Sequence, residues 1–77
     1  MTIPAEELQH EYRNAVAAMD EFLDEWIDHW GDWIYRQTYD ENILRAGMQL
    51  GYKIQAALRE RWLADLDQLA ASFSVKH

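Results

Sequence analysis

Residues 24–35 read DEWIDHWGDWIY, and the fold depends on whether one helix continues through the glycine at position 31. Upstream of this stretch, apolar residues alternate between spacings of four and three, which is the period of a helix. A helix from about residue 4 to at least residue 30 is therefore predicted, with Pro4 tolerated in its first turn. Its apolar stripe consists of Leu8, Tyr12, Ala15, Met19, Phe22 and Trp26, widened on one flank by Val16, Leu23 and Trp30.

A second helical run follows the tetrapeptide Thr38-Tyr-Asp-Glu41. Threonine followed three residues later by glutamate is the pattern of a capping box, so Thr38 is the predicted N-cap. The apolar residues beyond it recur at helical spacing and predict a helix over about 40–72. They are Ile43, Leu50, Ile54, Leu58, Trp62, Leu66, Leu69 and Phe73.

Gly31 leaves two architectures open for the single domain formed by residues 1–77. A glycine inside a helix costs about 1 kcal/mol relative to alanine, so it is either tolerated or ends the helix. If it is tolerated, the first helix reaches about residue 36 and the chain is an antiparallel two-helix hairpin. If the helix stops there, Asp32 caps a short middle helix and the chain forms a three-helix bundle.

The pairing of large with small residues favours the hairpin. A turn centred near residues 38–39 places Trp30 opposite Gly47 and Trp26 opposite Gly51. Rings that meet glycines interdigitate in the way that a packed core requires. The same turn places Phe22 opposite Ile54, Met19 opposite Leu58 and Ala15 opposite Trp62.

Two helices cannot cover all of the apolar surface that the sequence specifies. Each helix would be about 50 Å long, and the second carries apolar residues beside its main stripe, namely Leu44, Met48, Leu63 and Ala70. We therefore expect a homodimer in which two hairpins form an antiparallel four-helix bundle. In architecture alone, this resembles the small two-helix dimers that regulate plasmid copy number.

The composition narrows the class of function. The 77 residues contain no cysteine, and the net charge is −7. Because phosphate contacts need clustered Lys and Arg, we expect no direct binding to nucleic acid. No apolar stretch is long enough to span a membrane. The first residues, MTIPAEEL, lack the basic and apolar regions of a secretion signal, so a cytoplasmic location is expected.

The most unusual local feature of the sequence is a run of acidic residues on the first helix with no basic residue among them. Asp20, Asp24, Asp28 and Asp32 are spaced four apart, and no Lys or Arg lies between Arg13 and Arg36. Each like-charge pair costs a few tenths of a kcal/mol in a helix. The acids are either a solvated face, partly neutralised by Arg45 and Lys53, or a docking surface. The candidate partner-binding residues are Asp20, Glu21, Asp24, Glu25, Asp28, Asp32, Trp33 and Tyr35.

Chemistry-bearing motifs are few. Glu7 and His10 have the spacing of di-iron ligands, but Leu8 occupies the core position between them, so both should face away from the core. His29 lies at helical spacing from acids, which fits a proton-linked role or a structural histidine. The sequence offers no cysteine nucleophile and no phosphate-binding loop. We therefore predict no catalytic, cofactor-binding or metal-binding residues.

The leading functional hypothesis is a non-enzymatic interaction protein that docks a basic surface through its acidic helix face. A nucleic-acid-binding protein is a suitable target, since the acids could occupy its phosphate groove and inhibit it. In composition the chain is similar to small acidic proteins that phages encode against host machinery. The alternatives are an assembly subunit that packs its apolar face on a larger partner, and a small all-helical enzyme.

Overall fold

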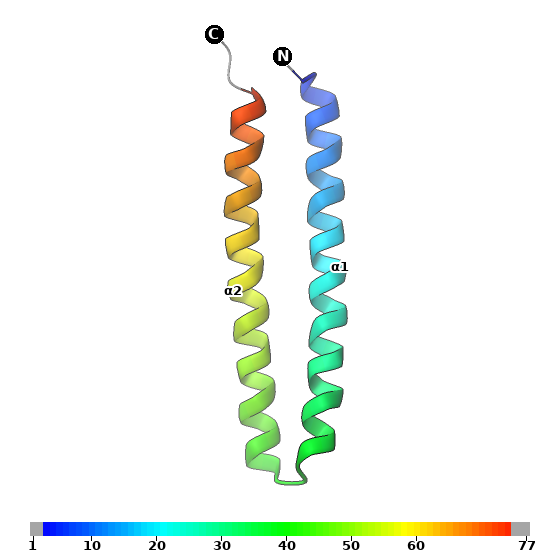
Figure 1. Ribbon diagram of the computed structural model, residues 1–77, viewed down its shortest axis with the longest axis vertical. Coiled ribbons are helices and arrows are strands. Elements are labelled where there is room, and N and C mark those ends of the chain that lie inside the picture. Colours follow the sequence, from blue (N-terminus) through cyan, green and yellow to red (C-terminus); the bar gives the residue numbers. More distant parts are fainter. Residues whose placement is uncertain (1–2, 75–77) are drawn as a thin grey trace.

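The computed structural model describes residues 3–74 and contains two helices, α1 (Ala5–Gln37) and α2 (Glu41–Ser74). Figure 1 shows the helices side by side and antiparallel, with the turn at one end of the molecule. Within residues 3–74 there is no strand, and the hairpin measures 59 × 16 × 12 Å. The predicted two-helix hairpin is confirmed, and the alternative of a three-helix bundle broken at Gly31 is wrong.

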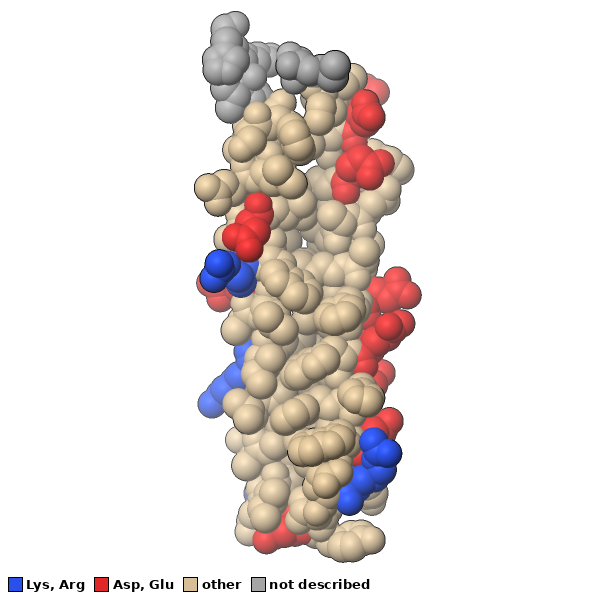
Figure 2. Space-filling view, in the orientation of Figure 1, with Lys and Arg blue, Asp and Glu red and all other residues tan. Residues whose placement is uncertain are grey.

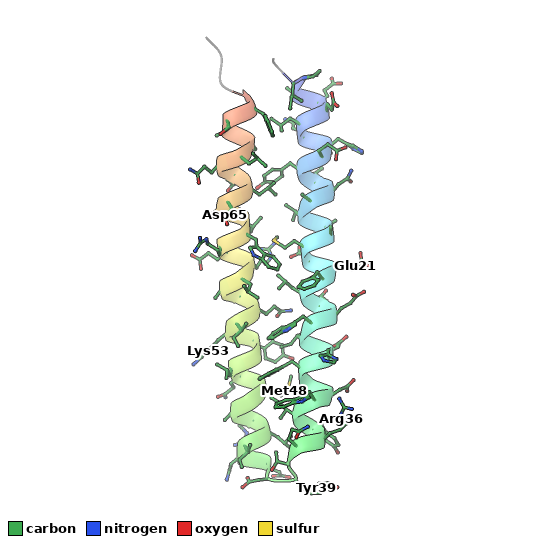
Figure 3. The ribbon with its side chains drawn as sticks, in the orientation of Figure 1. Glu21, Arg36, Tyr39, Met48, Lys53 and Asp65 are labelled. Atoms are coloured by element: carbon green, nitrogen blue, oxygen red, sulfur yellow. The ribbon has the colours of Figure 1, made fainter. Side chains whose placement is uncertain are left out.

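Helix α1 runs through Gly31 without a break. Ile27 and Ile34, on either side of the glycine, are both buried against α2. A Cβ placed on Gly31 would lie 3.4 Å from the Met48 side chain, and Figure 3 shows Met48 between the two helices. Packing on both sides of the glycine therefore holds the helix together and offsets its cost of about 1 kcal/mol.

The turn differs from the predicted capping box. Thr38 has an extended backbone and ends α1, while its Oγ1 accepts a hydrogen bond of 3.1 Å from the Asp40 amide. Asp40 then caps α2, because its Oδ1 accepts a 2.9 Å hydrogen bond from the amide of Asn42. The prediction of Thr38 as the cap of α2 is wrong. α2 begins only at Glu41, so the cap falls on the acid directly before it.

The core is small and is displaced from the predicted stripe. Among the described side chains, those of Leu23, Ile27 and Ile34 are the buried hydrophobic ones. Phe22, which was predicted at the centre of the stripe, is 54% exposed. The line of contact with α2 has therefore rotated by about one residue around α1, toward the flank of the stripe.

The two glycines of α2 allow the helices to approach closely. A Cβ on Gly47 would contact Ile34, and one on Gly51 would contact Trp30 and Ile27. Trp30 thus remains close to Gly47, as predicted, and its Nε1 donates a 2.9 Å hydrogen bond to the Gly47 carbonyl. Trp26 does not occupy the place over Gly51 that the sequence suggested, because the rotation of the contact line brings Trp30 and Ile27 there.

Two further contacts across the helices define the register. Gln55 Nε2 donates a 3.1 Å hydrogen bond to the carbonyl of Leu23. The ring of Trp62 lies 5.8 Å from the ring of Phe22, centroid to centroid. The ring of Trp62, which was predicted to face Ala15, thus lies beside Phe22, which is two helical turns closer to the turn.

Candidate functional site

Five carboxylates form a continuous strip along α1, which we call the acidic strip: Glu21, Asp24, Glu25, Asp28 and Asp32. All five side chains are exposed. Figure 3 shows Glu21 pointing away from α2, and Figure 2 shows acidic atoms along the edge of the molecule that α1 forms. The spacing predicted from the sequence therefore gives an accessible, ordered row of negative charge.

Asp20 belongs to a different environment. Its Oδ1 accepts a 2.8 Å hydrogen bond from Nε of Arg59, which also forms an ion pair with it. This hydrogen bond to Asp20 raises the pKa of the Arg59 guanidinium. Asp20 therefore carries a counter-ion on α2, and it is only partly available to a partner.

In the part of the chain that the structure describes, no cation lies at ion-pair distance from the acidic strip. Within residues 3–74 the ion pairs are Asp20–Arg59 and the exposed Arg61–Asp65 pair at 3.4 Å. Arg45 and Lys53 form no ion pair with the acids of α1 among these residues. Arg36 lies one turn beyond Asp32, but its Nε donates to the main-chain carbonyl of Asp32.

The two aromatic candidates, Trp33 and Tyr35, lie on different surfaces. Trp33 stacks on Trp30 with ring centroids 5.6 Å apart, and Trp30 stacks on Trp26 at 5.8 Å. Tyr35 is 69% exposed and follows Asp28 by seven residues, which places it beside the acidic strip. The structure therefore groups Tyr35 with the strip and Trp33 with a stack of three tryptophans.

The tryptophan stack is part of a larger apolar surface that the sequence did not single out. We call it the aromatic face, and it consists of Phe22, Trp26 and Trp33 on α1 together with Ile43, Leu50 and Ile54 on α2. The Asp20–Arg59 pair lies on the opposite side of the hairpin, because those residues occupy the other flank of each helix's contact line. Figure 2 looks onto the aromatic face and shows uncharged side chains along its middle, with charged ones at its borders.

The surface depressions of the hairpin are open and shallow. One of about 370 Å³ is lined by both charged and apolar residues: Asp20, Leu23, Asp24, Gln55, Ala56 and Arg59. An apolar one of about 260 Å³ lies between the ends of the helices that are distant from the turn, and Tyr12 and Leu66 are among its lining residues. His29 borders another depression together with Asp32, Tyr35 and Arg36.

Metal-ligating side chains do not converge within the described part of the chain. Glu7 and His10 are both exposed, as the position of Leu8 predicted. No group of three or more His, Asp or Glu side chains able to hold a metal ion occurs within residues 3–74. Over the same residues, neither helix is long and apolar enough to cross a membrane.

One polar contact joins the helices near their termini. The hydroxyl of Tyr12 donates a hydrogen bond to Oδ1 of Asp67. This bond raises the pKa of Tyr12 above its usual value of 10.0, and the negative charge of Asp67 acts in the same direction. The contact stabilises the fold below about pH 10 and is lost as the pH rises through the raised pKa of Tyr12.

We predict that the substitution Asp67→Asn lowers the pKa of Tyr12, because it removes both the charged acceptor and the like charge. A phenolate absorbance titration, with the Tyr12→Phe variant subtracted to isolate this residue, measures the change. Wild-type Tyr12 should ionise at higher pH than Tyr12 in the Asp67→Asn variant. If the two titrations coincide, the contact between Tyr12 and Asp67 is not formed in solution.

Comparisons of the chain with protein-family models, with curated proteins and with solved structures find no match to any of them. The class of protein is therefore defined by its fold and surfaces: an all-helical hairpin with an acidic strip on one helix and an aromatic face spanning both.

Proposed function

We propose that this chain is a non-enzymatic interaction protein that docks a basic protein surface through the acidic strip. The observation that carries the proposal is the absence of a counter-ion for any of the five strip carboxylates within residues 3–74. Neighbouring acids on a helix repel one another by a few tenths of a kcal/mol per pair. A cationic partner would relieve that repulsion and add favourable ion pairs.

The geometry of the strip suits a regular array of cations. Residues four apart on a helix are separated by about 6 Å along its axis. Asp24, Asp28 and Asp32 therefore present three carboxylates at about that interval. A basic helix with Lys or Arg at every fourth position offers the matching spacing. Such arrays also grip phosphates, so a nucleic-acid-binding protein is the class of target that we favour, with inhibition as the outcome.

A defined peptide probe tests the docking proposal. The probe is a helical peptide with Lys at every fourth position, and a scrambled peptide of equal composition is its control. The combined variant Asp24→Asn, Asp28→Asn, Asp32→Asn should weaken binding roughly tenfold at low salt, because three exposed ion pairs are lost. Fluorescence anisotropy of the labelled peptide measures the affinity.

A matched variant distinguishes the effect of the strip on peptide binding from the effect of the overall net charge. Glu6→Gln, Glu7→Gln, Glu60→Gln removes the same number of charges from exposed positions outside the strip. It should weaken binding less than the strip variant, since screening reduces the effect of distant charges. Equal losses in the two variants, or equal affinity for the scrambled peptide, would show that the strip is only a solvated face.

We further propose that the working form is a homodimer in which two hairpins make a four-helix bundle. A single layer of two helices has no second layer against which to bury its apolar surface. The described part of the chain accordingly buries only three hydrophobic side chains, those of Leu23, Ile27 and Ile34. Association of two copies supplies the missing layer.

An assembly subunit is the second candidate function, and the exposed aromatic face favours it. In that case a larger, different protein would cover the face in place of a second copy. The isolated chain would then remain a monomer of 9.2 kDa. Sedimentation equilibrium of the purified chain distinguishes the two candidates, since the homodimer has twice that mass.

A further inference from the structure

The aromatic face exposes several large apolar side chains. Phe22, Trp33, Ile43 and Leu50 are each between 46% and 55% exposed. Trp33 belongs to the stack with Trp30 and Trp26, and the other three residues occupy the same side of the hairpin by their helical positions. Contiguous apolar patches with a polar border mark interaction sites on soluble proteins.

The excess surface has the size that a stable dimer buries. A compact protein of 9.2 kDa exposes about 4,900 Å² by the usual scaling with mass, whereas the hairpin exposes 6402 Å². The excess is therefore roughly 1,500 Å² per copy. Obligate dimers bury about 1,000–2,500 Å² on each partner, so one second copy is enough to account for it.

The two borders of the aromatic face differ in charge. On its α1 side lie Glu21 and Glu25 of the acidic strip, whereas the α2 side carries Lys53, which has no ion-pair partner within residues 3–74, and Arg61, which is paired with Asp65. Figure 3 shows Glu21 and Lys53 pointing outward on opposite edges of the hairpin. A two-fold axis that lays α1 of one copy over α2 of the other brings these borders together with opposite signs.

We infer that the aromatic face is the surface on which a second copy of this chain packs, through the exposed rings of α1 and the apolar residues Ile43, Leu50 and Ile54 of α2. This inference rests on the homodimer of the proposed function and assigns its interface. Most of the acidic strip faces away from α2, so Asp24, Asp28 and Asp32 remain available to a basic partner in the dimer.

The test uses the full chain and sedimentation equilibrium. Wild-type protein should sediment at twice 9.2 kDa. The variant Ile43→Lys, Leu50→Lys places two charges in the interface and should weaken dimerisation on the order of a hundredfold. Both positions are half exposed in the hairpin, so the monomer should keep its helical circular dichroism.

A variant on the opposite side provides the matched control. Gln49→Lys, Tyr52→Lys adds the same two charges at exposed positions on the flank that carries Arg59. This variant should remain a dimer. A wild-type monomer would overturn the homodimer itself, whereas a wild-type dimer that survives Ile43→Lys, Leu50→Lys would overturn only the assigned interface.

A second measurement uses the wild-type protein, so that its result does not depend on whether the lysine variant folds. Quenching of tryptophan fluorescence by a soluble quencher should increase when the protein is diluted below its dissociation constant, because Trp26 and Trp33 then lose their cover. Quenching that is independent of concentration across the dissociation measured by sedimentation would place the interface elsewhere.

Discussion

Replacing Leu23 with alanine is expected to lower the free energy of unfolding by about 2–5 kcal/mol. Leu23 is 1% exposed, the most completely buried side chain in the described part of the chain. Truncation removes its buried methyl groups and leaves a cavity that two long, rigid helices cannot readily close. A domain of this size is stable by only about 3–5 kcal/mol, so the variant should be largely unfolded.

Urea unfolding followed by circular dichroism, at one fixed protein concentration, measures this loss. The variant Leu23→Met is the control, because it conserves volume and should cost less than about 1.5 kcal/mol. A loss below 1 kcal/mol for Leu23→Ala would contradict the position of the contact line between α1 and α2.

The second large effect is expected at Gly51, where alanine should destabilise the protein despite being the better helix former. A Cβ at this position would lie 2.6 Å from Nε1 of Trp30 and 2.8 Å from Cδ1 of Ile27. The indole is fixed by its stacking and by its hydrogen bond to Gly47, so it cannot move without loss. Overpacking costs about 1–3 kcal/mol, which exceeds the gain of about 1 kcal/mol in helix propensity.

Gly31→Ala is the matched control for Gly51→Ala. The added Cβ would lie 3.4 Å from Met48, at ordinary contact distance, so the propensity gain should dominate and raise the thermal midpoint. The two variants therefore shift the midpoint in opposite directions. If Gly51→Ala were instead the more stable of the two, the close approach of the helices over Gly51 would be incorrect.

The hairpin could be predicted from the sequence because its strongest signals are local. Helical spacing, the turn residues and the glycines of α2 all indicate the same two elements. The rotation of α1 about its axis could not be predicted in the same way. Apolar residues from Phe22 to Ile34 cover more than one face, so periodicity alone leaves the contact line undefined.

Packing geometry explains which line is used. Helix axes in contact are about 8–10 Å apart, a gap that suits branched aliphatic side chains. Ile27 and Ile34 therefore lie between the helices, while the indoles of Trp26 and Trp33 lie to one side. The aromatic face is a consequence of this arrangement. It could not be predicted from the sequence, because the helical periodicity assigns Trp26 to the core.

The acidic strip could be predicted from the spacing of its residues. The spacing could not show that Asp20, unlike the strip, has a counter-ion on α2. The ion pair of Asp20 with Arg59 joins residues 39 positions apart and depends on how α2 is rotated. No pattern in the neighbouring sequence indicates how α2 is rotated about its axis. The same limitation explains why the sequence suggested Arg45 and Lys53, and not Arg59, as neighbours of the acids of α1.

The most direct test of the two-surface account is a native mass spectrum of the wild-type chain with the lysine-repeat peptide. A complex of two chains and two peptides is expected, because the aromatic face joins the chains while each acidic strip stays free. A complex of one chain with one peptide, or a protein dimer that releases both peptides at low salt, would contradict it.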